Sequence, residues 1–287
     1  MTEATVTDLI NLLDLEEIEK NHYRATSPSE GWQRVYGGQV LGQALVAASR
    51  TVPAEREAHS LHGYFLRAGD TTVPILYKVD RIRDGRSFTT RRVVAIQHGR
   101  PIFNMSISFQ VHEEGLSHQF DMPEAPAPES LADERELREQ WAARLPPEQV
   151  ESFNRERPID VRPIDPQDIF HPEQKPPQQM CWMKAHARLP DDPRLHQCVL
   201  AYLSDWSLLD TATLPHAVSF MQQNIQMASL DHAMWFHRPF RADEWLLYVQ
   251  DSPSASGARG LNRGLIYDRS GSLVASAAQE GLIRLHR

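Results

Sequence analysis

The chain contains one short stretch twice. Residues 60–67 begin with Ser-Leu and end with an aromatic pair and Arg67, and residues 229–238 begin with Ser-Leu and end in the same way at Arg238. The aromatic pair and the arginine come two residues later in the second stretch than in the first. An internal match of this kind predicts two copies of one structural unit, so we expect the chain to fold as a repeat.

The first copy is predicted to be a helix followed by strands. Residues 37–48 are small and apolar on nearly every side, which is typical of a helix enclosed by other elements. Beyond this helix the hydrophobic pattern changes from helical spacing to alternation, which indicates strands separated by turns. We predict an antiparallel meander of four strands that wraps the helix, over residues 61–66, 75–81, 88–97 and 101–111.

The second copy follows the same order. Asp192 followed by Pro193 is a strong helix start, because Asp caps a helix and Pro is favoured in its first turn. The predicted helix, residues 194–209, is again apolar almost all round. Its strands are expected from Ser229 to Pro239 and over residues 245–251, 258–267 and 273–284. Two helices, each wrapped by an antiparallel sheet, give an α+β fold.

Residues 113–157 differ from both copies. Prolines bracket a charged helix, predicted over residues 131–145 with Ser130 as its N-cap, whose charges indicate a solvated face. Such a segment is typical of a linker that crosses the surface. The expected regions are therefore a first repeat over residues 1–112, a linker over 113–157 and a second repeat over 158–287.

Composition excludes several classes of function. The net charge of −8 argues against a general nucleic-acid binder. The chain has no apolar run of about 18 residues and no signal-peptide pattern at its start, so no membrane span is predicted and the cytoplasm is the expected compartment. Cys181 and Cys198 are too few for a disulfide framework or a metal site, and their apolar neighbours indicate buried, inert thiols.

Asp205 is the most unusual residue of the second helix. One turn to either side it meets Ala201, Tyr202, Leu208 and Leu209. A buried carboxylate in such surroundings costs several kcal/mol unless it has partners. Its side chain either escapes to solvent or faces a pocket, and in a pocket it could orient or deprotonate a water molecule.

Three more residues of the second copy could take part in chemistry. Ser229 begins a predicted strand, which alone is weak evidence. Gln279 lies among small side chains that leave space before it, and its neutral amide suits holding a water. His232 is a candidate substrate-binding residue and the rival base, although an imidazole beside Trp235 is more often a hydrogen-bonded core residue. Serine-hydrolase elbows, zinc-binding helices and phosphate-cradling loops have no match in the sequence.

Several motifs together resemble those of the bacterial acyl-CoA thioesterase II family, whose eukaryotic relatives are peroxisomal. The motifs are Gly37-Gly38-Gln39-Val40, Phe65-Leu66-Arg67, Met234-Trp235-Phe236-His237-Arg238-Pro239 and Ser256-Gly257-Ala258-Arg259-Gly260. They occur in the family's order along essentially the whole chain. The resemblance implies the double hotdog fold, in which two repeats each wrap a long helix in an antiparallel sheet, and hydrolysis of fatty acyl-CoA to free acid and CoA without metal or organic cofactor.

The resemblance also implies a site. The family's catalytic Asp, hydroxyl residue and Gln fall on Asp205, Ser229 and Gln279, which would hold the water that attacks the thioester. The glycine pair at Gly38 could admit the substrate or supply oxyanion donors, although it is equally well explained as a tight turn.

Further expectations concern the substrate and partners. Arg259 and Arg263 are candidates for binding the CoA phosphates, with surface salt bridges as the competing role. One working site per chain and a homo-oligomer, dimer or tetramer, are expected, the latter by analogy alone. Two other functions stay open: a hotdog enoyl-CoA hydratase using His232 and Asp231, and a catalytically dead acyl-CoA-binding protein.

Overall fold

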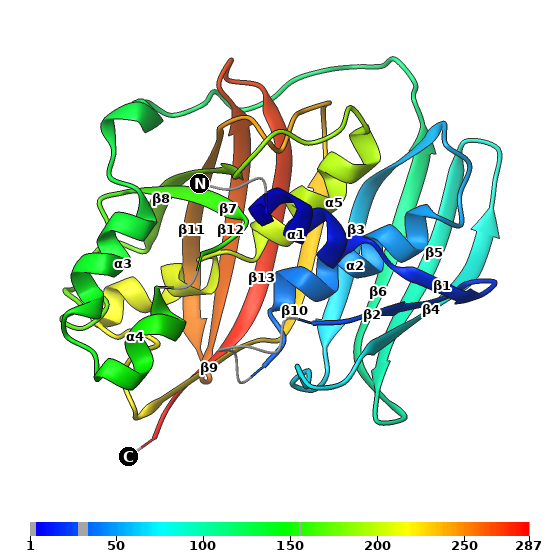
Figure 1. The fold of residues 1–287 in the computed structure, drawn as a ribbon. Helices are drawn as coiled ribbons and strands as arrows, with labels where there is room; N and C mark the ends of the chain where they lie inside the picture. Colours follow the sequence, from blue (N-terminus) through cyan, green and yellow to red (C-terminus); the bar gives the residue numbers. More distant parts are fainter. Residues whose placement is uncertain (1–3, 28–33, 155, 287) are drawn as a thin grey trace.

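The two repeats are joined along one pair of strands, β3 (Arg56–Phe65) and β10 (Asp231–Phe236). In the computed structural model, which describes residues 4–27, 34–154 and 156–286, these strands lie at the middle of one antiparallel sheet (Figure 1). The order of its described strands is β1-β2-β4-β5-β6-β3-β10-β13-β12-β11-β8-β7, with β9 added on β13. The duplicated stretches of sequence therefore pair with each other at the junction of the repeats.

The N-terminal repeat is the predicted helix and meander, extended by a small hairpin. Four strands follow the helix as expected, and the strand over residues 88–97 has the predicted bounds. Its elements are α1 (Ala4–Leu13), β1 (Glu16–Glu19), β2 (His22–Ala25), α2 (Gly37–Ser49), β3, β4 (Ile75–Asp84), β5 (Phe88–Gln97) and β6 (Arg100–Val111).

The C-terminal repeat has the same arrangement around its own helix. The linker precedes it with η1 (Pro128–Ser130), α3 (Glu134–Ala142) and α4 (Pro147–Phe153). The repeat itself comprises β7 (Ile159–Ile164), β8 (Gln178–Ala185), α5 (Pro193–Ser204), η2 (Leu209–His216), β9 (Ile225–Ser229), β10, β11 (Leu246–Ser256), β12 (Arg259–Asp268) and β13 (Leu273–Leu285).

Two helix predictions were too long. The linker helix begins at Glu134 rather than after Ser130, because the Asp133 side chain caps the Arg135 N–H and Glu136 completes a capping box. Helix α5 ends at Ser204 rather than at residue 209, with Asp205 as its C-cap. Ser207 then takes a left-handed conformation (φ 58°), which cannot continue a helix.

The strand register relates the repeats by an approximate two-fold axis. Leu61 pairs with Met234, and Gly63 pairs with His232 on the other side of the central His62–Ala233 pair. Phe65 is the last residue of β3 and Phe236 is the last residue of β10. In both repeats the backbone N–H of the next residue donates to the strand on the outer side, β6 or β13.

The arginine that ends each duplicated stretch follows the same symmetry. Arg67 donates to the Pro101 carbonyl at 2.6 Å, and Arg238 donates to the Leu273 carbonyl at 2.9 Å. The internal symmetry assigns every residue near the junction a counterpart in the other repeat.

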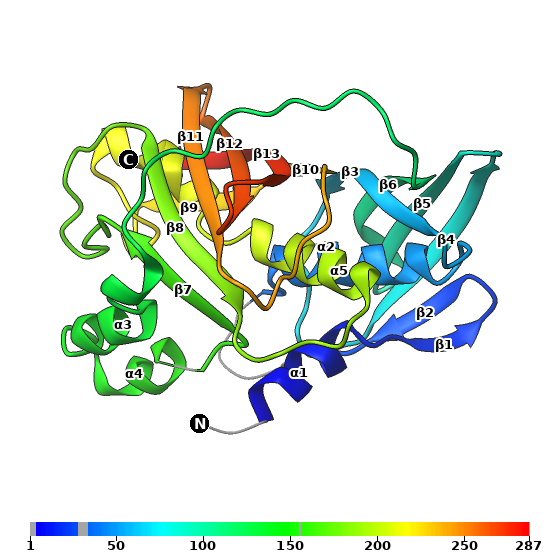
Figure 2. The same cartoon turned by 90° about the horizontal axis from the view of Figure 1, so that it is seen from above.

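Helices α2 and α5 lie side by side and antiparallel inside the curved sheet (Figure 2). The N-terminus of α2 meets the C-terminus of α5. The two helices approach so closely that a Cβ atom at Gly38 would overlap the Tyr202 carbonyl oxygen. At the other end, Arg194 of α5 donates to the Ser49 carbonyl. Glycine at position 38 is thus required for the close approach of the two helices.

The linker crosses one face of the C-terminal half of the sheet. Arg238 donates to Ser117 and to the His118 carbonyl, and Trp182 donates to the Pro126 carbonyl at 2.8 Å. Behind it, Trp182, Leu247, Tyr267 and Leu273 form a second apolar cluster. Within the described ranges, every helix is too short or too polar to cross a bilayer.

Candidate active site

Asp205 lies where the two helices meet, at the C-cap of α5. Its Oδ2 accepts the backbone N–H of Gly38 at 2.9 Å, and its Oδ1 accepts from Gln279 Nε2 at 2.5 Å. The Ser229 side chain lies near enough to the same carboxylate to lower its pKa. The structure therefore brings together four residues predicted from the sequence: Asp205, Ser229, Gln279 and Gly38.

Burial dominates the acidity of Asp205. Desolvation raises the pKa of its carboxyl to about 6, while the hydrogen bonds from Gln279, Gly38 and Ser229 lower it. A Cβ atom at Gly37 would lie 2.6 Å from Asp205 Oδ2, so the glycine leaves the carboxylate room beside the start of α2. The result is a carboxylate that changes charge near neutral pH and is ionised above it.

Gln279 is held on β13 with no exposed surface. Its amide nitrogen donates twice, to Asp205 Oδ1 at 2.5 Å and to His232 Nδ1 at 3.2 Å. Its Oε1 is buried and has no hydrogen-bond partner among the described residues. A buried acceptor without a partner costs free energy unless something fills it, so Oε1 is an open position for a donor.

Ser229 was predicted to be the first residue of a strand. In the structure it is instead the last residue of the preceding strand, β9. It pairs with Gly281 of β13, two residues beyond Gln279. The chain then turns at Leu230, whose N–H donates to the Glu280 carbonyl, and β10 begins at Asp231. This short break separates Ser229, which pairs with β13, from the strand that pairs with β3.

Arg259 and Arg263 lie apart from this cluster. Both are exposed residues of β12, alternating with the buried Gly260, Asn262 and Gly264. Arg259 pairs with Glu280 at 2.8 Å, and Arg263 pairs with Asp251 at 2.8 Å. The structure thus shows the salt bridges that the sequence offered as their competing role.

The wall of the site contains residues that the sequence did not single out. The Tyr36 hydroxyl, just before α2, donates to the Tyr202 carbonyl at 3.0 Å, and its ring packs edge-on against Trp206. Arg157 of the linker lies over the Trp206 ring at 4.2 Å. Aromatic residues directly beside Gly37 and Asp205 were a usable signal for the first two, but nothing local marked Arg157.

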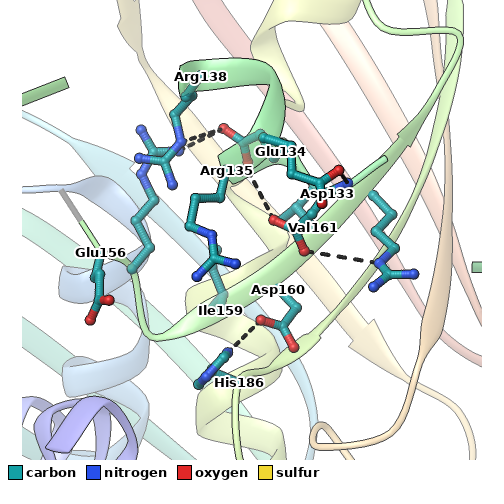
Figure 3. Close-up of a pocket in the computed structure, with 12 residues that line it drawn as sticks. Asp133, Glu134, Arg135, Arg138, Glu156, Ile159, Asp160, Val161 and His186 are labelled. Carbon is teal, nitrogen blue, oxygen red and sulfur yellow. Dashed lines mark hydrogen bonds and ion pairs between the residues drawn. The ribbon is translucent and has the colours of Figure 1, made fainter. Parts of the chain in front are cut away.

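Arg157 also lines a polar cleft of about 270 Å³ between α3 and β7 (Figure 3). The charges that line it are largely paired. Glu134 accepts from Arg157 at 2.7 Å, and His186 bonds Asp160 at 2.5 Å. The cleft is therefore close to neutral, and through Arg157 it connects the linker to the wall of the Asp205 site.

Burial also shifts the pKa of an acid and two thiols elsewhere in the second repeat. Burial raises the pKa of Asp210, in η2, to about 7, with the charges of Glu134 and Asp205 adding to the effect. Burial also raises the pKa of Cys181 and Cys198 to about 12. Both thiols are free and buried, as predicted. Thiols in this state are poor nucleophiles.

The other end of the helix pair has no comparable cluster. By the internal symmetry, Ile107 takes the position of Gln279, Leu61 takes that of His232, and Arg50 at the α2 C-cap takes that of Asp205. Leu61 and Ile107 are 0% and 1% exposed. In the part of the chain that the structure describes, no group of His, Cys, Asp and Glu is arranged to hold a metal ion.

The fold is of the double hotdog class. A hotdog-fold protein of Alicyclobacillus acidocaldarius, 17% identical, superposes over 100% of both chains with a TM-score of 0.77. Residues 27–110 match the family model for the acyl-CoA thioesterase N-terminal domain, and residues 149–282 match the model for acyl-CoA thioesterase. These matches cover both helix-and-sheet repeats.

The chain belongs to the acyl-CoA thioesterase II family and is a thioester hydrolase. It is 42% identical to acyl-CoA thioesterase 2 of Haemophilus influenzae, over 97% of this chain and 98% of that one. Acyl-coenzyme A thioesterase 8 of Mus musculus is 44% identical, with 99% and 90% covered. The crystal structure of TesB2, an acyl-CoA thioesterase II of Mycobacterium marinum, is 48% identical, with 96% and 97% covered and a TM-score of 0.78.

Proposed function

We propose that this protein hydrolyses fatty acyl-CoA thioesters with a water molecule held by Asp205, Ser229 and Gln279. The observation that carries the proposal is a desolvated carboxylate that accepts from Gly38 and Gln279, placed beside a buried acceptor, Gln279 Oε1, that is open to a further donor. A water bound there would donate one proton toward Asp205 and the other to Oε1.

The chemistry needs one proton transfer at each stage. The water oxygen attacks the thioester carbonyl carbon as its proton passes to ionised Asp205. The tetrahedral intermediate then expels the CoA sulfur, which takes that proton back and leaves as the thiol. Because the Gly38 N–H is already bonded to Asp205, we assign stabilisation of the oxyanion to the N–H of Gly37, in the first turn of α2 where backbone donors lack helical acceptors.

A release-of-thiol assay on palmitoyl-CoA tests the proposal. The wild type should liberate CoA, and Asp205→Asn should lose most of that activity while keeping its fold. An enoyl-CoA hydratase would instead change the absorbance of an enoyl-CoA without freeing thiol, and a non-catalytic binder would do neither. Normal thiol release by Asp205→Asn would reject this site.

Binding of the CoA phosphates is a separate question. Arg259 and Arg263 stay candidates, but a phosphate would have to displace Glu280 and Asp251 from them. Arg259→Ala and Arg263→Ala should then raise KM for palmitoyl-CoA while leaving the KM for a short thioester without the nucleotide unchanged. An equal effect on both substrates would show that the two arginines act through stability alone.

The organisation of the chain completes the proposal. Residues 1–112 form the N-terminal repeat, 113–157 the linker and 158–287 the C-terminal repeat that carries the catalytic side chains, in a cytoplasmic homo-oligomer. The two free, buried cysteines support that compartment. Sedimentation equilibrium would establish the number of chains, with a monomer rejecting the oligomer.

A further inference from the structure

A chain of hydrogen bonds leads away from Asp205 into the core. The Ser204 hydroxyl has one proton, which it donates to the Ala201 carbonyl at 2.9 Å. The bond between Ser204 Oγ and His232 Nε2, also 2.9 Å, must therefore use a proton on the imidazole. This leaves His232 Nδ1 as an acceptor, which receives the second N–H of Gln279 at 3.2 Å.

The same chain determines which way the Gln279 amide points. With Asp205 ionised, the group 2.5 Å from Oδ1 has to be the amide nitrogen, because two acceptor oxygens at that distance would repel. His232 Nδ1 imposes the same choice from a second direction. Reversing the amide would place its oxygen against both acceptors, so its carbonyl is held toward the open position.

We infer that His232, held by Ser204, is a positioning residue that fixes the Gln279 amide so that Oε1 accepts a hydrogen bond from the attacking water. The inference rests on the proposed function, since it assigns a role within the same site. It differs from the sequence prediction, which treated His232 as a substrate-binding residue and as the rival general base.

The surroundings of His232 exclude a direct role in proton transfer. The residue is 1% exposed, and both ring nitrogens are engaged by Ser204 and Gln279. Burial lowers the pKa of the imidazole to about 3, so the ring stays neutral at the pH at which Asp205 is ionised. The neighbouring carboxylate of Asp231 alternates to the opposite side of β10, where it accepts the Glu280 N–H.

The N-terminal repeat shows which side chain the fold accepts at the position of His232 when no positioning role is needed. Ser49 ends α2 as Ser204 ends α5, but the residue opposite is Leu61 instead of a histidine. Leu61 faces Ile107, the counterpart of Gln279. The fold itself therefore accepts an aliphatic pair at these positions, and the His232–Gln279 pair is an addition that packing does not explain.

The test compares His232→Leu, which copies the N-terminal repeat, with His232→Asn, whose side-chain oxygen can replace Nδ1 as the acceptor. We expect His232→Leu to lower kcat by about ten- to a hundredfold with KM within about twofold, in the range of a lost orienting contact. His232→Asn should recover much of that loss. The acid limb of the pH profile should move to higher pH in His232→Leu. A loosened Gln279 amide donates less well to Asp205, and this hydrogen bond lowers the pKa of that carboxyl.

A spectroscopic measurement reads the tautomer directly. In protein labelled with ¹⁵N histidine, His232 should show a protonated Nε2 and an unprotonated Nδ1 that do not change between pH 5 and 8. A protonated Nδ1, or a ring that titrates in that range, would overturn the inference. So would a His232→Leu variant with unchanged kcat and pH profile.

Controls separate this inference from the proposed function. Leu61→Val alters the equivalent buried position of the N-terminal repeat and should leave kcat unchanged. If Asp205→Asn abolishes thiol release while His232→Leu keeps normal kinetics, the positioning role fails and the proposed function stands. If Asp205→Asn keeps its activity, the proposed function fails, whereas the tautomer measurement still tests the hydrogen-bond chain.

Discussion

The two ends of the helix pair share a backbone arrangement but differ in chemistry. Where α5 ends, Asp205, His232 and Gln279 form a hydrogen-bonded cluster. Where α2 ends, Leu61 and Ile107 pack in the core, and Arg50 bonds outward to the Leu15 carbonyl and to Asp14. The comparison teaches that the fold supplies the frame twice, while a few side chains at equivalent positions make one end reactive.

Each end also shows a different solution to burial. At the apolar end the buried pair Leu61 and Ile107 has no polar side-chain group to satisfy, so these two side chains need only fit. The polar end has to provide a partner for every buried donor and acceptor, and among the described residues it leaves Gln279 Oε1 without one. A buried acceptor without a partner, held by the same amide that donates to Asp205, is the physical mark of a site that binds something.

The largest effect is expected from removing the charge that distinguishes the polar end. Asp205→Asn should lower kcat for palmitoyl-CoA at least about a hundredfold, because the water loses its base. Thiol release measures this, and circular dichroism checks the fold. As a control, Arg50→Gln at the equivalent C-cap should change stability and leave kcat within about twofold. A large loss of kcat in the control would mean that the two ends are not functionally distinct.

A reciprocal exchange tests whether the polar end can be turned into the apolar one. Gln279→Ile, which copies Ile107, should reduce kcat by about a hundredfold with little loss of stability. The reverse change, Ile107→Gln, should cost about 1–3 kcal/mol in urea unfolding, because it buries an amide without partners. Activity gained by Ile107→Gln, or retained by Gln279→Ile, would contradict the assignment of the site to one repeat.

Acidity offers a third way to test the difference. Because the pKa of Asp205 is raised to about 6 and its ionised form is the active one, kcat/KM should rise with pH between pH 5 and 7. The rise should be about tenfold, following the ionised fraction of one group. A profile flat over this range would show that Asp205 is not the titrating base.

The same shift predicts a change in stability with the opposite sign. The folded protein binds the Asp205 proton more tightly than the unfolded chain does, so the contribution of this group falls as pH rises from its ordinary pKa of 3.8 to about 6. The difference in Tm between Asp205→Asn and the wild type should therefore become more favourable to the variant from pH 4.5 to pH 8. Calorimetry at the two pH values measures it.

The smallest effect concerns the two equivalent arginines. Arg67→Ala loses a bond to Pro101, whereas Arg238→Ala loses bonds to Leu273 and to the linker residues Ser117 and His118. At about 0.5–1.5 kcal/mol for each hydrogen bond, Arg238→Ala should be the more destabilising by about 1 kcal/mol or more. Limited proteolysis should also cut the linker faster in Arg238→Ala. Equal effects would show that the linker contacts add nothing.

Much of this fold could be predicted from the sequence because the repeat is visible at several levels. The enclosed helices, the alternation of the strands and the matched Ser-Leu stretches all indicated two helix-and-sheet units. The pairing of those stretches with each other could not be predicted, since pairing between distant strands is set by tertiary packing. The predictions of two helix ends were wrong for a local reason. A capping box at Asp133 and the left-handed conformation of Ser207 set those ends against the sequence pattern.

The sequence allowed the residues of the site to be predicted, but not the contacts among them. The isolated acid in an apolar helix marked Asp205, and the family resemblance singled out Ser229 and Gln279 from weaker candidates. What the sequence could not show is that the Gly38 N–H holds Asp205, or that His232 reaches Gln279, because these contacts join elements far apart along the chain. Arg259 and Arg263 were chosen for charge alone, and charge does not reveal nearby carboxylates such as Glu280.

The bond from Gly38 to Asp205 crosses between the repeats, and it has a consequence for how such a chain could diversify. Neither half can build the reactive centre by itself, yet only the later half has to keep the polar side chains. Joining the halves in one polypeptide guarantees that each partner is present in equal number and frees the earlier half to become a dedicated scaffold. Halves produced as separate polypeptides would regain turnover only after reassociating.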